Sequence, residues 1–346
     1  MELLPWYMMY MPISGIEIFW PGLVLIGFSV GVIGGFFGMG GAWLVTPGLN
    51  ILGFPMAFAI GTDIAHIAGK SMIATIRHAK FGNVDVKLGL AMLVFTMIGI
   101  EIGARLVMYL EALGIVGPVV RWIYVGFLCV IFLMILTDIL KKLKMEKEAK
   151  AGGVEVDKKK RGLDLSTPLH KIKIPPMMHF KEAGIYCSLW LPGMVGLITG
   201  VLAGFLGIGG GMLRMPALIY FVGCPTHVAV GTDLFEVMLS GLYGAFTFTL
   251  KGRIELIAVV VMLCGASIGA QIGTVATKYS RGLGILFWFM VCIVVCMISI
   301  ILKQYGFVTI AGVLILGVVF IVCGVIIRIM LIGALAELRA KKAAGK

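Results

Sequence analysis

The stretch GGFFGMGGAWLVTPGLNILGFPMAFAIGTD runs from Gly34 to Asp63, and AGFLGIGGGMLRMPALIYFVGCPTHVAVGTD repeats its pattern from Ala203 to Asp233. Each copy places a GxGG turn, a proline and a final Gly-Thr-Asp in an otherwise apolar segment. An offset of 169 residues aligns ten identical positions from Gly31 to Leu49 with the second copy, and an offset of 170 aligns the Gly-Thr-Asp triplets. A match of this extent indicates an internal duplication.

The composition is that of a membrane protein, because 60% of the 346 residues are hydrophobic and only 13% are charged. Apolar segments of about 20 residues predict transmembrane helices. We expect such helices at residues 56–80, 87–110, 117–140, 226–250, 254–277, 282–302 and 306–333. The glycine-rich segments 21–53 and 184–223 precede the first and fourth of them. The prediction is an all-α polytopic membrane protein with about seven or eight spans plus hairpins.

The net charge of +12 is concentrated in two segments. Residues 141–183 hold twelve Lys and Arg against six Asp and Glu, and the chain from Arg328 onward holds five against one. The positive-inside rule places both segments in the cytoplasm, so the excess charge does not indicate a nucleic-acid partner. Residues 1–20 contain no basic residue, unlike a signal peptide, and their Trp and Tyr predict an interfacial helix.

The chain is therefore expected to have two homologous repeats, each starting with a helix that its glycines break. The predicted parts are an N-terminal interfacial segment 1–20, repeat 1 at 21–140, a basic cytoplasmic linker 141–183, repeat 2 at 184–302, an extra transmembrane helix 303–335 and a basic cytoplasmic tail 336–346. Loop charges favour inverted repeats whose broken helices are re-entrant hairpins, with only Lys251 and Arg253 on the unexpected side. Parallel repeats with discontinuous helices that cross once are the alternative.

The glycine turns predict two half-helices that meet inside the membrane, because consecutive glycines stabilise a helix poorly. The free N–H groups at a helix start that faces a cavity can bind an anion. Two such turns near the bilayer midplane would form a paired anion site. The alternative is that the glycines only let helices pack closely. No βαβ pattern supports a dinucleotide site.

Both copies end in a carboxylate inside an expected span. An ionised carboxylate at membrane depth costs roughly 2.5–3.5 kcal/mol on insertion scales, so Asp63 and Asp233 are candidate functional residues. Helical spacing places His66 and Lys70 on the face of Asp63, and Glu236 on the face of Asp233. Structural ion pairs that hold helices together are the alternative for these charges.

The next helices carry further polar residues. Glu101 and Arg105 stand four residues apart, and matching IGAR (102–105) with IGAQ (268–271) aligns them with Ser267 and Gln271. Arg214, just after the second glycine turn, could contact an anion or extend toward the membrane surface.

These patterns define a site built from both halves. The residues expected to bind substrate are Gly38, Gly40, Gly41, Thr62, His66, Lys70, Arg105, Gly207, Gly209, Gly210, Gly211, Thr232 and Gln271. The residues expected to exchange protons are Asp63, Asp233 and Glu236. We predict no catalytic residue, metal or cofactor, because the seven cysteines contain no CxxC pair and the chain has no HExxH or GxSxG motif.

The doubled GxGGxxxxxP element, the GxVD at 82–85 and the IGA runs resemble the TauE/SafE sulfite exporter family. The resemblance covers nearly the whole chain outside the linker. It implies a secondary transporter of sulfite, sulfoacetate or related organosulfur anions, coupled to the proton gradient. It also supports Pro47 and Pro216, with the glycines before them, as the hairpin elements. This chain departs from the family with Thr-Asp where Thr-Ser is expected, and negative charges beside an oxyanion are unfavourable unless protonated or countered.

The sequence thus predicts a secondary active transporter for small anions, sulfite or organosulfonates first, coupled to protons. An anion-selective channel, and a carrier for a different small anion or carboxylate, are the alternatives. An enzyme is not expected. The expected partners are the anionic substrate and the lipid bilayer of the cell membrane. The sequence leaves open the transport direction and whether the protein forms a homodimer.

Overall fold

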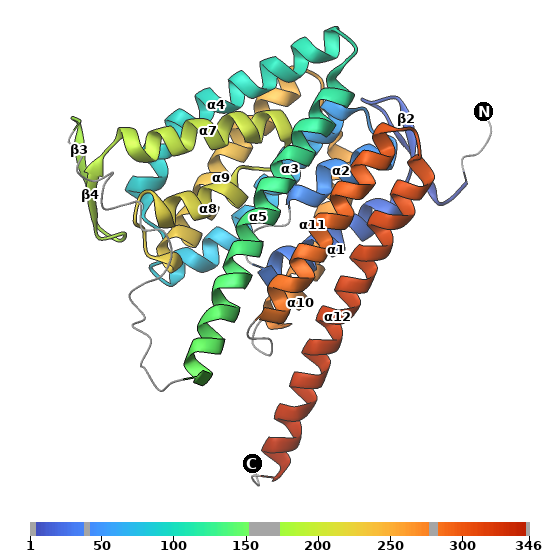
Figure 1. The fold of residues 1–346 in the computed structure, drawn as a ribbon. Helices are drawn as coiled ribbons and strands as arrows, with labels where there is room; N and C mark the ends of the chain where they lie inside the picture. The colour runs from blue at the N-terminus through green and yellow to red at the C-terminus, as the bar shows by residue number, and fades with distance from the viewer. Residues whose placement is uncertain (1–4, 38–41, 152–173, 277–282, 344–346) are drawn as a thin grey trace.

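The computed structural model describes residues 5–37, 42–151, 174–276 and 283–343, and these are mostly helical (Figure 1). In the first half the elements are β1 (Met8–Met11), β2 (Ile16–Phe19), α1 (Trp20–Phe37), a short 3-10 helix η1 (Ala42–Leu44), α2 (Val45–Ile51), α3 (Met56–Lys80), α4 (Val86–Ala112) and α5 (Val116–Ala151). In the second half they are β3 (Met177–Phe180), β4 (Ile185–Ser188), α7 (Trp190–Leu206), α8 (Gly211–Tyr220), α9 (Thr226–Leu250), α10 (Leu256–Ala276), α11 (Leu283–Gln304) and α12 (Val308–Ala343).

A β-hairpin precedes the first helix of each half. β1 pairs with β2, and β3 pairs with β4, both antiparallel. The two turns contain Gly15 and Gly184, which adopt φ values of +68° and +65° that favour glycine. The expected interfacial helix in residues 1–20 is therefore wrong, because the alternating pattern of Ile16–Phe19 suits a strand. The second hairpin begins inside the expected linker.

Two parallel helix pairs join the halves, because α1 lies along α10 and α7 lies along α4. A Cβ atom on Gly31 would stand 2.4 Å from the carbonyl oxygen of Ala266, and one on Gly200 would stand 2.5 Å from that of Thr96. Only a residue without a side chain lets two helix backbones approach so closely. The close-packing interpretation of glycine is thus confirmed for the helices that precede the turns.

These contacts correct the sequence match between α4 and α10. Gly99 and Gly269 face corresponding backbone positions of α7 and α1, so they are counterparts at an offset of 170. Glu101, and not Arg105, is therefore the counterpart of Gln271. Matching IGAR with IGAQ is wrong by one helical turn, because glycine recurs every four residues in both helices and hides the register.

Helices α3 and α9 pack against each other in opposite directions. Gly61 near the start of α3 contacts Phe248 near the end of α9, whereas Ala68 further along α3 contacts Gly241. The short helices α2 and α8 pack on α3 and α9, respectively. The centre of the fold therefore contains α2 and α3 from the first half and α8 and α9 from the second.

The Gly-Thr part of each Gly-Thr-Asp triplet contacts a loop of the other half. Thr62 Oγ1 accepts a hydrogen bond from the N–H of Glu255 at 3.1 Å, and Thr232 Oγ1 accepts one from the N–H of Asp85 at 2.9 Å. Gly61 leaves room for this approach, because a Cβ there would stand 2.3 Å from the Arg253 carbonyl oxygen. The two threonines therefore join the halves of the chain.

The acids that start α4 and α10 hold the two hairpins. Asp85 Oδ2 accepts hydrogen bonds from the N–H groups of Glu182 and Ala183, both at 3.1 Å. Glu255 Oε2 accepts from two N–H groups of the β1–β2 turn, at 3.0 and 3.1 Å. Each hairpin is thus attached to a helix of the opposite half.

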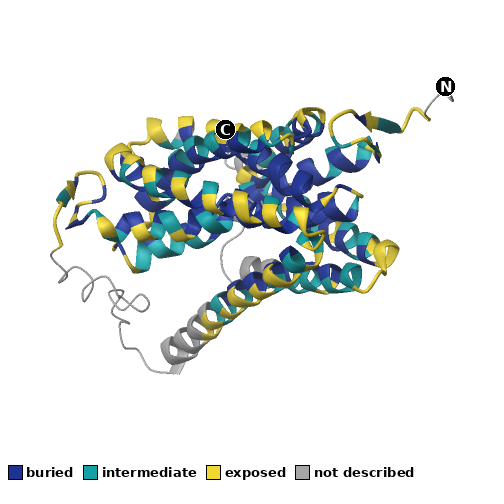
Figure 2. Ribbon diagram, turned by 90° about the horizontal axis from the view of Figure 1, so that it is seen from above, coloured by how far each residue is buried: buried dark blue, intermediate teal, exposed yellow. Residues whose placement is uncertain are grey.

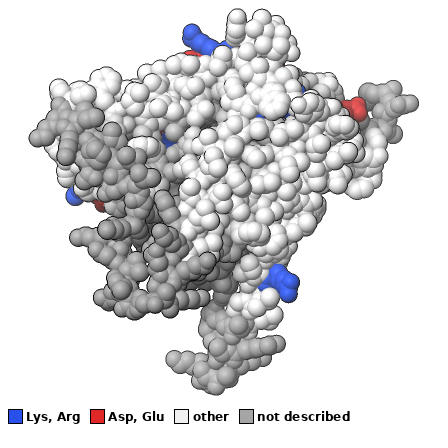
Figure 3. All heavy atoms as spheres, viewed as in Figure 1, with Lys and Arg blue, Asp and Glu red and all other residues white. Residues whose placement is uncertain are grey.

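All seven expected spans lie in helices. Five of the helices have nearly the expected bounds, whereas α5 continues to Ala151, inside the expected linker, and α12 continues to Ala343, beyond the expected end at 333. By length and composition, four helical segments among the described residues can cross a membrane: Val86–Ala112, Val116–Thr137, Leu256–Ala276 and Val308–Leu335. Helices α3, α9 and α11 are not among these four, although spans are expected there. Helices α3 and α9 carry the ionisable residues of the predicted site. The buried residues lie inside the helix bundle (Figure 2), and the face seen in Figure 3 shows few charged side chains among the described residues. These features are those of a multi-pass all-α membrane protein.

Candidate functional site

The glycine turn of the second half interrupts the helical structure between the end of α7 and the start of α8. Gly207, Gly209 and Gly210 have φ values of +79°, +65° and +74°, which residues with a Cβ rarely adopt. The predicted break is confirmed in this copy. Pro216 lies in the middle of α8 and not in its first turn, whereas Pro47 is the third residue of α2. The predicted Gly38, Gly40 and Gly41 of the first turn lie outside the described residues.

Arg214, in the first turn of α8, is completely buried and lies among polar side chains of α7 and α9. Its Nε donates a hydrogen bond to Thr199 Oγ1 at 3.1 Å, and its Nη1 lies 3.5 Å from Asp233 Oδ1. Nη1 also forms an ion pair with Glu236 Oε2. We call these four residues the Arg214 cluster. It places two carboxylates around one guanidinium, so its formal charge is negative when all three groups are ionised.

Asp63 of α3 lies at the corresponding place in the first half, and its hydrogen-bond donors are neutral. The backbone N–H and the hydroxyl of Thr46 donate hydrogen bonds to Asp63 Oδ2 at 3.0 and 2.7 Å. The His66 ring stands one turn further along α3, with Nδ1 3.9 Å from Asp63 Oδ1, and Lys70 follows at the next turn. Asp63 and His66 are fully buried. We call these four residues the Asp63 cluster.

The second glycine turn lies between the two clusters. A Cβ on Gly207 would stand 2.5 Å from Thr46 Oγ1 of the Asp63 cluster. A Cβ on Gly211 would stand 2.8 Å from Asp233 Oδ2, and one on Gly210 would stand 2.7 Å from Arg214 Nη2. Side chains at these positions would therefore fill the space beside the charged groups, which explains why the turn is glycine.

Several polar atoms in the two clusters are buried and have no hydrogen-bond partner among the described residues. They are Asp63 Oδ1, both ring nitrogens of His66, Lys70 Nζ, Arg214 Nη2 and Glu236 Oε1. A buried polar atom without a partner is unfavourable and calls for an explanation, such as a functional role or a bound polar species. This arrangement can therefore accept an anion at Arg214 Nη2 and protons at the carboxylates.

The structure does not bring all predicted site residues together. Asp63, His66, Lys70, Asp233, Glu236 and the glycines 207 and 209–211 lie in or beside the two clusters. Thr62 and Thr232 contact the loops of the opposite half instead. The Arg105 side chain is 76% exposed and pairs with Glu101 at 2.7 Å, and Gln271 is exposed on α10.

The structure adds Thr46, Thr199 and Arg214 to the predicted set. Arg214 supplies the guanidinium of the second half, and Thr46 supplies both donors to Asp63. The position of Arg214 directly after a glycine turn is a signal that the sequence contains. Thr46 is the second residue of α2, and nothing in its spacing indicates contact with Asp63.

Comparison with known proteins places the chain among membrane transporters. A family model described as "Sulfite exporter TauE/SafE" matches residues 23–301. The chain is 25% identical over 265 residues to "Probable membrane transporter protein YunE" of Bacillus subtilis, covering 74% of this chain and 88% of the relative. It is 29% identical over 234 residues to "Probable membrane transporter protein MJ0441" of Methanocaldococcus jannaschii, covering 66% and 72%. No solved structure matches the chain.

The family match covers most of the chain and includes both glycine turns and both charged clusters. Members of this family are membrane transporters and not enzymes. The chain therefore belongs to the TauE/SafE sulfite exporter family of membrane transporters.

Proposed function

We propose that this protein is a secondary active transporter of small anions in the cell membrane, with sulfite or an organosulfonate as the substrate and with coupling to protons. The substrate binds at Arg214, beside the glycine turn of residues 207–211. The observation that carries this proposal is the completely buried guanidinium, whose Nη2 faces the turn and has no hydrogen-bond partner in the part of the chain that the structure describes.

The anion preference follows from the geometry around Arg214. Guanidinium groups form strong, directional hydrogen bonds with oxyanions such as carboxylate and phosphate, and sulfite and sulfonate present oxygens in a comparable way. The first N–H groups of α8 have no partner within the helix and add positive partial charge. Gly210 and Gly211 keep side chains out of the space next to Nη2 and Asp233.

Proton coupling follows from the charges of the Arg214 cluster. Asp233 and Glu236 both contact Arg214, so an incoming anion competes with them for the same guanidinium. A carboxylate that loses its cation inside a membrane protein is costly unless it takes up a proton. Binding of the anion therefore favours protonation of Glu236 or Asp233, and the anion and the proton move together.

The helix directions support inverted repeats. Corresponding helices α3 and α9 run in opposite directions, and a two-fold axis that relates antiparallel helices is perpendicular to them. If both cross the membrane, this axis lies in the membrane plane, as in inverted-repeat transporters. Helices α1 and α7 are then parts of re-entrant hairpins that enter from opposite sides, and alternating access occurs between the two clusters.

The proposal is tested by uptake into proteoliposomes that contain the purified protein. Sulfite, sulfoacetate, taurine and simple carboxylates are supplied with and without an imposed pH gradient. We expect saturable uptake of at least one oxyanion that increases with an acidic exterior, since a carrier saturates and a proton drives it. Uptake that is linear with concentration and insensitive to the pH gradient would contradict the proposal and indicate a channel.

Variants of the cluster connect this activity to Arg214. Arg214→Gln is expected to abolish uptake, whereas Arg214→Lys retains a charge and part of the activity. Arg105→Gln is the matched control, because Arg105 is exposed and pairs only with Glu101 among the described residues. It should leave uptake unchanged. Equal uptake by wild type and a folded Arg214→Gln variant would refute the proposed site.

A further inference from the structure

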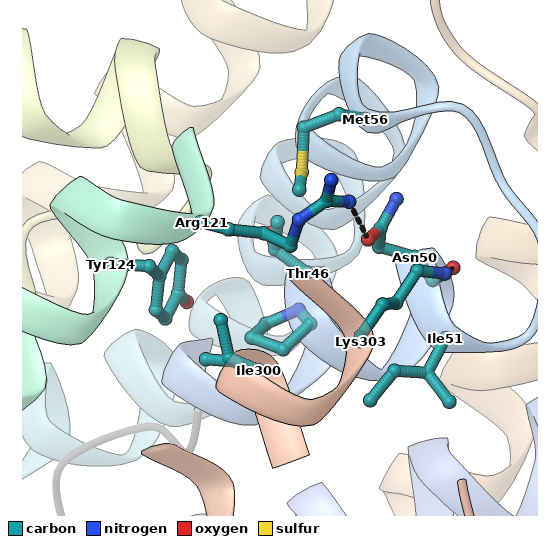
Figure 4. A pocket seen from close by; sticks show the side chains of 9 residues that line it. Thr46, Asn50, Ile51, Met56, Arg121, Tyr124, Ile300 and Lys303 are labelled. Atoms are coloured by element: carbon teal, nitrogen blue, oxygen red, sulfur yellow. Dashed lines mark hydrogen bonds between the residues drawn. The ribbon is translucent and has the colours of Figure 1, made fainter. Parts of the chain in front are cut away.

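Two cations, Arg121 and Lys303, lie in a pocket between α2, α5 and α11 (Figure 4). Arg121 extends from the first turns of α5, and Lys303 comes from the last turn of α11. Asn50 of α2 lies between them, and Ile51, Met56 and Ile300 form apolar walls. Among the residues that the structure describes, no carboxylate lines this pocket.

Both cations contact only neutral acceptors among the described residues. Arg121 Nε donates to Gln304 Oε1 at 2.6 Å, and Nη1 donates a longer bond to Asn50 Oδ1 at 3.4 Å. Lys303 Nζ donates to the Asn50 carbonyl oxygen. The Asn50 amide is itself occupied, because its Nδ2 donates to the Phe54 carbonyl at 3.0 Å. Asn50 thus accepts hydrogen bonds from both cations, and the two positive charges repel each other.

The pocket also borders the Asp63 cluster. Thr46, which donates to Asp63 Oδ2, is one of its lining residues. Tyr124 lines it as well and donates through its hydroxyl to the Trp43 carbonyl oxygen at 3.0 Å. An ion in this pocket would therefore be separated from Asp63 by the side chain of Thr46.

Two cations in a partly buried, mainly apolar pocket repel each other, and an anion between them removes this repulsion. The Arg121 guanidinium can offer a fork of N–H donors to two oxygens of an anion, and Lys303 can add a third charged donor. The apolar walls lower the local dielectric and strengthen such contacts.

We infer that Arg121 and Lys303 form a second oxyanion-binding site, separate from Arg214. Its ligand carries at least two oxygens on a sulfur, carbon or phosphorus atom. A soluble sulfite, carboxylate or phosphate ion and the phosphate of an anionic lipid headgroup share this chemistry. The inference goes beyond the proposed function, because an anion can bind here whether or not the protein transports it.

A purely structural role makes a different prediction. Lys303 would then only bind the Asn50 carbonyl oxygen at the end of α2, and Arg121 would only join α5 to α11 through Gln304. Removal of either charge would destabilise the protein with or without an anion. In an anion site, by contrast, removal of both charges relieves repulsion in the empty state and weakens only the anion-bound state.

The test is a binding measurement on the full-length protein in neutral detergent. Sulfite, acetate and inorganic phosphate are titrated at constant ionic strength, and binding is followed by the rise in Tm, because a ligand stabilises the state that binds it. We expect the double variant Arg121→Gln/Lys303→Gln to raise the Kd of the preferred anion by about tenfold or more, since two charge-assisted hydrogen bonds are lost. Its Tm without anion should equal or exceed that of wild type.

A second set of measurements, with lipids, shows whether the oxyanion is a soluble ion or a lipid headgroup. The same proteins are measured in nanodiscs of phosphatidylcholine with and without phosphatidylglycerol. Stabilisation by soluble anions or by phosphatidylglycerol supports the site if the double variant loses it. If the double variant does not fold, Lys303→Gln alone should lose most of the stabilisation and Arg121→Lys should keep it.

The inference is overturned if the folded variants keep the wild-type Kd for every soluble anion and the wild-type response to phosphatidylglycerol. Arg214→Gln separates this result from the proposed function. That variant should lose uptake but keep anion-dependent stabilisation at Arg121 and Lys303. Loss of all stabilisation in Arg214→Gln, with none lost in the double variant, would leave Arg214 as the anion site and refute the second one.

Discussion

Asp63 and Asp233 have the same sequence context but different partners. Asp63 accepts hydrogen bonds from Thr46, and Asp233 lies beside Arg214. At the offset of 169, Arg214 corresponds to Val45 of the first copy. The duplicated motif therefore fixes where both acids lie, and one difference after the turn, Arg214 in place of Val45, gives Asp233 a guanidinium beside it. The sequence could predict the positions of the acids but not their partners.

The threonine of each Gly-Thr-Asp triplet is expected to stabilise the fold, because its hydroxyl accepts a hydrogen bond from a loop of the other half. Thr62→Val removes the acceptor for the Glu255 N–H but keeps the shape of the side chain. We expect a loss of roughly 1–3 kcal/mol in unfolding free energy, the usual effect of leaving a buried donor without a partner. Substrate Kd should not change. The measurement is Tm and substrate binding of the purified variant.

Thr249→Val is the matched control for this prediction. Thr249 is exposed on α9, and its hydroxyl donates to the Ala245 carbonyl of its own helix. Its replacement should change stability by no more than about 0.5 kcal/mol. Equal stability of both variants, with weaker substrate binding in Thr62→Val, would show that Thr62 belongs to the substrate site.

At the scale of elements, glycine decides which helices meet. The sequence predicted the helices closely but not that α1 pairs with α10 and α7 with α4. Helix periodicity indicates an apolar face and not the identity of the facing helix. Glycine spaced by four residues was an available signal, because it permits backbone contact along a whole helix. The same regularity hid the register and led to the wrong match between α4 and α10.

The helix contacts give a prediction that compares two glycines. A methyl group on Gly200 would clash with the Thr96 carbonyl, whereas one on Gly126 of α5 has nothing within 4 Å. Gly200→Ala should lose about 1–3 kcal/mol, because an overpacked contact must separate. Gly126→Ala should gain up to ~1 kcal/mol, since alanine favours helix over glycine. Denaturant titration of both variants checks this, and a Gly200→Ala variant as stable as Gly126→Ala would contradict the contact.

The hairpins give a prediction about thiol reactivity. Cys187 in β4 is 1% exposed, and burial raises the pKa of its thiol to about 11, so the unreactive neutral thiol predominates at pH 7.5. Asp85→Asn weakens the contact between Asp85 and the β3–β4 turn. We expect maleimide labelling of Cys187, mapped by mass spectrometry, to be slow in wild type and at least several-fold faster in this variant.

Glu255→Gln provides the control for thiol labelling, because Glu255 holds the other hairpin. It should leave the labelling of Cys187 unchanged. If Cys187 reacts as fast in wild type as in Asp85→Asn, the β3–β4 hairpin is not held by Asp85.

In the whole molecule, helices of each half pack against helices of the other half: α1 packs on α10, and α7 packs on α4. In Figure 1, β3 and β4 lie at the left edge and β2 at the right edge, and α5 and α12 extend downward toward the linker and the C-terminus. Loop charges predicted inverted repeats, and the antiparallel packing of α3 and α9 supports them. The packing of helices from one half on helices of the other could not be predicted, because it depends on contacts between residues more than 100 positions apart.

Inverted repeats place the two hairpins on opposite sides of the membrane. Tyr10 and Tyr186, which are 52% and 59% exposed, are suitable positions for single cysteines in a cysteine-free background. In intact cells, an impermeant maleimide should label Tyr10→Cys, and Tyr186→Cys should react only after permeabilisation, because the basic linker before β3 favours the cytoplasm. Labelling of both from the same side would contradict the inverted arrangement.

The central claim is that an anion displaces carboxylates from Arg214, and that a displaced carboxylate, Glu236 or Asp233, then takes up a proton. It is tested most directly by recording oxyanion uptake and proton uptake together in proteoliposomes containing wild type, Arg214→Gln or Glu236→Gln. We predict coupled uptake of both ions in wild type, no uptake in Arg214→Gln, and anion uptake with fewer protons per anion in Glu236→Gln. Anion uptake in wild type without proton movement, or with an unchanged proton ratio in Glu236→Gln, would contradict the claim.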